Sequence, residues 1–139
     1  MTSEFCIAVH ALVFLNHKAT TLSSEELAEN ICTNPARVRK VMGRLKHAGL
    51  VETKEGIDGG YHFSLAPDSV TLRAVGEALD ASFVSSAWRS GNKDMTCLIA
   101  SGMASIMDGI YEDLNQLCLD HLDTITIDDL DHRIFKKPS

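Results

Sequence analysis

The sequence lacks an apolar run of about 18 residues, the length that a membrane-spanning helix needs. Its first four residues carry no positive charge and do not lead into the long apolar stretch of a signal peptide. Cysteine is scarce, and its scattered positions exclude a disulfide scaffold or a C-x-x-C zinc pair. These absences predict a cytoplasmic protein with no membrane partner. The 4 cysteines are Cys6, Cys32, Cys97 and Cys118.

Signatures of catalysis and of metal binding are also missing. The 6 histidines show no H-x-x-x-H spacing, and the chain has neither a Gly-x-Ser-x-Gly elbow nor a P-loop. We therefore expect no enzyme, no cofactor and no metal site. What remains is a chain of 139 residues, 45% hydrophobic and 23% charged, which is typical of one globular domain.

The net charge of −6 conceals a strong asymmetry along the chain. Residues 33–54 hold six bases and one acid, a net charge of +5, so the remainder carries −11. Residues 94–132 hold nine acids and neither Lys nor Arg. A local basic patch on an acidic protein indicates a specific contact surface for a polyanion, although a solvated helix face is the simpler alternative.

Helical spacing and capping signals predict three helices in the first half of the chain, over residues 3–17, 24–31 and 35–48. Ser23 and Glu26 form a capping box for the second helix. Asn34 and Pro35 supply the cap and first turn of the third, and Gly49 is suited to end it. Two helices joined by a short turn, the second carrying the bases, have the proportions of a helix-turn-helix.

The rest of the chain predicts a β-hairpin, or wing, followed by two more helices. Residues 50–54 and 61–65 alternate as strands, residues 71–81 form a fourth helix, and residues 96–122 form a long one. Residues 124–130 suggest an extended piece and a last helical turn. The long helix carries a heptad-like apolar seam, which favours packing against a second copy over an ordinary core role. The seam comprises Ile99, Met103, Ile106, Ile110, Leu114, Leu117 and His121.

The predicted fold is therefore mainly α with a small β-hairpin: a winged helix-turn-helix domain plus a long dimerisation helix. We divide it into a DNA-binding domain (1–81), a sensor loop (82–97) and a dimerisation helix with its tail (98–139). The segment Thr33–Val51, followed by Gly56-x-x-Gly59-Gly60-Tyr61, resembles the Rrf-type family of bacterial winged helix-turn-helix transcriptional regulators. The resemblance implies a homodimer that binds an inverted-repeat operator in double-stranded DNA and usually represses transcription.

By the same resemblance, the recognition helix and the wing supply the DNA contacts. In many relatives the wing carries basic residues where Glu55 and Asp58 stand here, which leaves open whether this wing enters the minor groove. Its glycines have a simpler role as turn residues with positive φ. The expected DNA-binding residues are Thr33, Pro35, Arg37, Arg39, Lys40, Arg44, Gly59 and Tyr61.

Many relatives hold an iron–sulfur cluster with three cysteines near the start of the long helix, but this chain has only Cys97 there. A helix N-terminus lowers the pKa of a thiol, and Lys93 is close in sequence, so Cys97 is the expected reactive thiolate. Cys32 precedes the recognition helix and is the expected resolving thiol, from the partner subunit, in a redox switch. Cys6 and Cys118 are expected to be buried and inert.

Two other functions remain open at this point. A regulator of the same family could respond to a small molecule held near Phe83, Trp88 and Arg89, although Trp88 is equally suited to a core position. A winged-helix adaptor could instead bind a protein through the acidic C-terminal half. Steep salt dependence of DNA binding distinguishes the regulator from the adaptor, because phosphate contacts release counterions.

Overall fold

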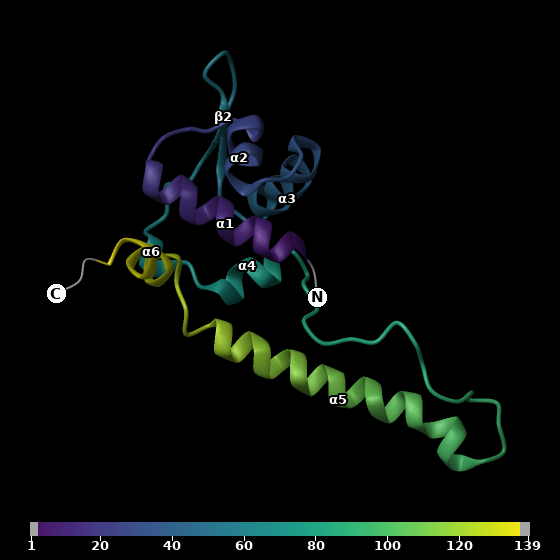
Figure 1. The fold of residues 1–139 in the computed structure, drawn as a ribbon. Helices are drawn as coiled ribbons and strands as arrows, with labels where there is room; N and C mark the ends of the chain where they lie inside the picture. The colour runs from purple at the N-terminus through teal and green to yellow at the C-terminus, as the bar shows by residue number, and fades with distance from the viewer. Residues whose placement is uncertain (1–2, 137–139) are drawn as a thin grey trace.

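The computed structural model describes residues 3–136, so Met1 and Thr2, with which the sequence begins, lie outside the described residues. Helices α1 (Ser3–Lys18), α2 (Ser24–Ile31), α3 (Pro35–His47) and α4 (Leu72–Ala78) form a compact head with the wing at one end (Figure 1). A short 3-10 turn, Pro67–Ser69, precedes α4. The predicted winged-helix fold class is confirmed. No helix within residues 3–136 is long and apolar enough to cross a bilayer.

The head is built around one apolar core to which every helix except α5 contributes a buried residue. Leu12 and Leu15 of α1, Leu27 of α2 and Val75 of α4 are fully buried there. The predicted capping box of α2 is present, and Gly49 follows α3 with a positive φ of 80°. Local capping and core-facing periodicity therefore act together to define these helices.

The wing is shorter than the sequence predicts. Its strands are β1 (Glu52–Lys54) and β2 (Gly60–His62), antiparallel, with Thr53 opposite Tyr61. Leu50 and Val51 were expected in the first strand. The Leu50 amide instead donates to Leu45 at the end of α3, and Val51 is buried in the core, so neither extends the ladder.

Helix α5 (Leu98–Leu122) forms an arm that extends away from the head, and we call it the arm below (Figure 1). It begins two residues later than predicted, with Cys97 as its N-cap. Its N-terminal end lies farthest from the head, and its C-terminal end returns to α4, where Arg73 pairs with Asp120 at 3.1 Å. None of the arm's residues is buried within this chain.

The C-terminal segment forms a complete helix, where the sequence indicated a single turn. Helix α6 (Ile127–Phe135) starts with a capping box of Thr126 and Asp129. It packs back against α1, and Ile127 is fully buried in the core. The sequence did not predict the full helix because a helix this short is stable only through long-range packing. α4 likewise ends at Ala78 instead of residue 81, because Asp80 adopts a left-handed φ of 50°.

Candidate nucleic-acid interface

The turn between α2 and α3 fixes the start of the predicted recognition helix. Cys32 ends α2 in the left-handed conformation, with φ 64°, and its amide donates to the carbonyl of Ala28. Asn34 Oδ1 accepts a hydrogen bond from the Arg37 amide at 2.8 Å, as a helix cap does. Pro35 lies in the first turn, where its missing N–H interrupts no helical bond. The sequence-predicted cap is therefore confirmed, and Thr33 leads directly into it.

α3 divides cleanly into a core face and an exposed face. Its four large apolar residues are fully buried, as their spacing predicts. All its other residues after Pro35 are exposed, and Ala36, Lys40, Gly43 and His47 lie opposite the core by helical geometry. Sequence reasoning missed Gly43. A glycine inside a helix costs about 1 kcal/mol relative to alanine, and a Cβ there would meet nothing within 4 Å.

Four of the five Lys and Arg side chains of α3 have partners within the head. On the side of α1 and α4, Lys40 Nζ lies 3.1 Å from a carboxylate oxygen of Glu4, and Arg44 donates to the carbonyl of Leu79 at 2.9 Å. Arg37 hydrogen-bonds to Ser3 Oγ on the same side. On the side of α2, Arg39 lies 3.7 Å from Glu25. These partners orient the cations without covering them, since the Arg39 and Lys40 side chains remain 54% and 69% exposed.

The wing is tied to the beginning of α2 by a pair of backbone hydrogen bonds. The Leu22 amide donates to Tyr61 O at 2.9 Å, and the Tyr61 amide donates to Leu22 O at 2.8 Å. Burial raises the pKa of the Tyr61 hydroxyl. A Cβ on Gly59 would lie 2.4 Å from the carbonyl oxygen of Lys54, so the tight turn itself requires this glycine. The structure thus places the predicted wing residues beside α2, with Tyr61 half-buried.

The acidic tip of the wing is fully accessible. Glu55 and Asp58 are exposed, and Ile57 projects between them with its whole side chain in solvent. The last base before the tip is Lys54, at the end of β1. The bases of residues 33–54 therefore lie on α3, apart from Lys54.

The four cysteines lie in different surroundings, and the prediction that Cys6 is buried is wrong. Cys6 is exposed, because α1 turns Ala8, Ala11 and Leu12 to the core and leaves Cys6 on the opposite side. Cys118 is half-buried. Cys32 lies in the turn before α3, the position that the sequence predicts, and it is exposed.

Cys97 is exposed as the N-cap of the arm. The backbone N–H groups of Ala100 and Ile99 lower the pKa of its thiol, although neither makes a close capping hydrogen bond to the sulfur. The helix terminus is the cause that the sequence predicted; Lys93 does not contribute to the shift. The N-terminal end of the arm lies far from the turn between α2 and α3 in the same chain (Figure 1).

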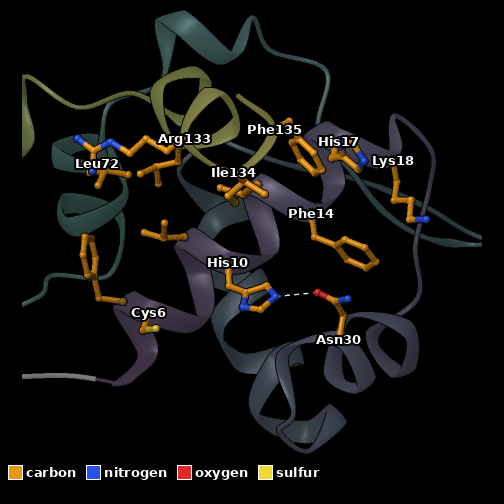
Figure 2. Close-up of a pocket in the computed structure, with 14 residues that line it drawn as sticks. Cys6, His10, Phe14, His17, Lys18, Asn30, Leu72, Arg133, Ile134 and Phe135 are labelled. Carbon is orange, nitrogen blue, oxygen red and sulfur yellow. Dashed lines mark hydrogen bonds between the residues drawn. The ribbon is translucent and has the colours of Figure 1, made fainter. Parts of the chain in front are cut away.

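An apolar groove of about 850 Å³ runs along α1 beneath α6, and Figure 2 shows its lining. The His17 ring stacks on Phe135 with centroids 3.9 Å apart, and His10 hydrogen-bonds to Asn30 at 2.7 Å. Lys18 and Arg133 add positive charge, and the lining contains no acidic residue. The groove is therefore an apolar surface with basic edges, which the sequence did not predict.

Comparison with known proteins gives one consistent result. The family model Rrf2, described as an iron-dependent transcriptional regulator, matches residues 1–133. YwnA of Bacillus subtilis, named as an HTH-type transcriptional regulator, is 23% identical over 97% of this chain and 99% of its own length.

Solved structures agree on the fold. A transcriptional regulator structure from Lactobacillus plantarum has a TM-score of 0.82 at 21% identity, covering 98% of this chain and 92% of its own. CymR, the global cysteine regulator of Bacillus subtilis, has a TM-score of 0.68 at 18% identity, covering 96% of each chain.

The iron in the family description finds no matching ligand set here. Within residues 3–136, no group of three His, Cys, Asp or Glu side chains is arranged to hold a metal ion. The loop that enters the arm contributes Cys97 as its one thiol, and Cys118 lies far along the helix. A cluster held by three neighbouring thiolates does not fit these residues.

Proposed function

The chain belongs to the Rrf2 family of transcriptional regulators, and we propose that it is a dimeric repressor that reads an inverted-repeat operator with α3. The observation that carries this proposal is the exposed, basic face of α3 on a chain that is otherwise acidic. In this proposal residues 1–81 bind DNA, residues 82–97 form the sensor loop and residues 98–139 mediate dimerisation.

DNA titrations at several salt concentrations test this reading. The duplex is the region upstream of the protein's own gene, and the variants are Arg39→Ala and Lys40→Ala. Each phosphate contact that is lost should reduce the salt slope by about 0.9. Arg73→Ala is the control, because Arg73 pairs with Glu77 and Asp120 away from α3. Absence of salt-dependent binding by the wild-type protein would favour the adaptor instead.

The exposed apolar residues of the arm support the proposed dimer. Five of its apolar residues that define the predicted seam are between 39% and 71% exposed in the single chain. The arm also carries four acids and no Lys or Arg, whereas the groove along α1 has basic edges and no acid. Because its C-terminal end rests on its own head, the N-terminal part of the arm is free to reach a second copy. We infer that it packs there, along the partner's arm and toward the partner's groove.

Sedimentation of two matched variants tests the dimer. Ile106→Asp places a charge on the seam, and Ser105→Asp places the same charge on the neighbouring exposed residue outside it. We expect a monomer for the first variant and a dimer for the second. A wild-type monomer, or a dimer that tolerates Ile106→Asp, would refute the interface.

The regulatory signal that we propose is an oxidant, sensed by Cys97. Its thiolate attacks a hydroperoxide, which breaks the O–O bond, forms a sulfenic acid and releases an alcohol or water. The thiol of Cys32 of the partner subunit then attacks that sulfur, forming a disulfide and releasing water. The exposure of both thiols and the lowered pKa of Cys97 support this sequence of steps.

Cysteine substitutions decide whether this switch exists. DNA affinity is measured before and after peroxide treatment for the wild type, Cys97→Ser and Cys32→Ser, with Cys118→Ser as the control. We expect reversible oxidant sensitivity in the wild type and the control and its loss in the other two. Retention of sensitivity in both Cys97→Ser and Cys32→Ser would rule out the proposed pair.

One observation favours a small-molecule signal as the second candidate. A cavity of about 270 Å³ lies between the sensor loop and the arm, lined by Trp88, Met103 and Tyr111 among others. Trp88 is 75% exposed and so is not a core residue. Phe83 is not part of this site, because it packs edge-on against Phe5. DNA binding that is tight and unchanged by peroxide would favour a small-molecule signal bound in this cavity.

A further inference from the structure

The carboxylate of Glu4 lies between two cations of the recognition helix. Its two oxygens are 3.1 Å from Lys40 Nζ and 3.9 Å from Arg44 Nη1. Glu4 belongs to the first turn of α1, far from α3 in sequence, and its side chain is only 23% exposed. An acid in the first turn of a helix is favourable for that helix by itself. The side chain also neutralises part of the face that is expected to meet DNA phosphates.

The Lys40 side chain is 69% exposed, so solvent screens its pairing with Glu4, and the pair contributes little to folding stability. A DNA phosphate that approaches Lys40 or Arg44 must displace the Glu4 carboxylate from beside these cations, and it is repelled by the same carboxylate. Binding of DNA and pairing with Glu4 therefore oppose each other at these two cations. The number of counterions that DNA releases on binding depends on how far Glu4 withdraws.

The position of Glu4 is linked to the arm through a short chain of contacts. The next residue, Phe5, packs edge-on against Phe83, with ring centroids 5.1 Å apart and planes at 87°. The backbone amides of Phe83 and Val84 both donate to Asn115 Oδ1, at 2.7 and 2.8 Å. Asn115 Nδ2 donates to Val84 O at 2.7 Å, and Asn115 is a residue of the arm. One arm side chain thus holds the loop against the first turn of α1.

We propose that Glu4 is an internal competitor for DNA at Lys40 and Arg44, and that Asn115, acting through Phe83 and Phe5, sets how firmly it competes. The proposal rests on the DNA-binding function proposed above. Movement of the arm relative to the head changes the hold of Asn115 on residues 83–84. The same movement shifts the first turn of α1 and with it the charge that α3 presents.

Two matched Glu→Gln variants of the full chain test the competition. Glu4→Gln removes the negative charge beside Lys40 and Arg44, whereas Glu77→Gln removes the same charge from a carboxylate that pairs with Arg73 on α4. We expect Glu4→Gln to bind a duplex from its own upstream region about threefold to fivefold more tightly, with a salt slope steeper by about 0.9 to 1.8. Glu77→Gln should leave the salt slope unchanged. Equal effects of the two variants would overturn the proposal, by showing that only total charge matters.

A double-mutant cycle tests the link to the arm. Asn115→Ala should tighten DNA binding in the wild-type background and have no effect in the Glu4→Gln background. Phe83→Leu removes the edge-on contact but keeps an apolar side chain, and we expect the same result from it. It replaces Asn115→Ala in the cycle if that variant does not fold. Equal effects in both backgrounds would refute the link. Failure of the wild-type protein to bind DNA would instead refute the proposed function, so the two failures are distinguishable.

Discussion

Replacing Gly60 with alanine should separate the wing from α2. Gly60 has φ 150°, and a Cβ there would lie 2.2 Å from the carbonyl oxygen of Leu22 and 2.9 Å from the amide nitrogen of Ser23. Both atoms belong to the backbone, so no side-chain rotation relieves the clash. The change costs about 1–3 kcal/mol for backbone strain and about 0.5–1.5 kcal/mol for each of the two Leu22–Tyr61 hydrogen bonds. We therefore expect a total loss of about 2–6 kcal/mol, a large share of the stability of a small domain.

Urea unfolding followed by far-ultraviolet circular dichroism measures this loss, with Gly56→Ala as the matched control. Gly56 lies in the same hairpin and also has a positive φ, 106°, but a Cβ there would meet nothing within 4 Å. The control therefore reports strain alone, and Gly60→Ala should be about 1–3 kcal/mol less stable than the control. If the two variants are equally stable, the bridge between Leu22 and Tyr61 does not hold the wing, and the reasoning is wrong.

Three further predictions concern single positions. Ile127→Ala should lower the free energy of unfolding in urea by about 2–5 kcal/mol, because Ile127 is fully buried in the head core. A loss below about 1 kcal/mol would show that α6 is not part of that core. Gly43→Ala should stabilise α3 by about 1 kcal/mol in thermal unfolding. It should also weaken DNA binding, and unchanged affinity would show that the helix does not approach DNA closely at Gly43. In a variant whose other cysteines are serine, iodoacetamide should alkylate Cys97 with a pH midpoint below that of the same chain in urea, because the folded helix terminus lowers the pKa and so favours the thiolate. An equal or higher midpoint in the folded protein would contradict this cause.

The sequence predicts the elements whose signals are local. Ser23 with Glu26 and Asn34 with Pro35 define helix starts within four residues, so the limits of α2 and the start of α3 follow directly from them. The apolar spacing of α3 predicts its buried face for the same reason. The family resemblance rests on this region, where local structure and function share the same residues.

Features that depend on distant contacts could not be predicted in this way. Glu4 and Lys40 meet only because α1 packs against α3, and nothing in the charge pattern of either segment indicates the pair. Cys6 has apolar neighbours in sequence, yet it faces the groove because other residues of α1 face the core. The full length of α6 depends in the same way on its packing against α1 and on burial of Ile127 in the core.

The length of the arm makes one further prediction about the operator. A helix of 25 residues is about 37 Å long, close to the 34–36 Å of one turn of B-DNA. If two arms pack side by side in opposite directions, each head lies at one end of the pair, and the heads cannot approach each other more closely than the arms allow. Because the arms are continuous helices, they cannot adjust to a changed spacing. Inserting about five base pairs between the half-sites turns one of them to the opposite side of the duplex and should abolish high-affinity binding in a titration. Full affinity for the lengthened operator would show that the two heads bind independently, and would refute a rigid pair of arms.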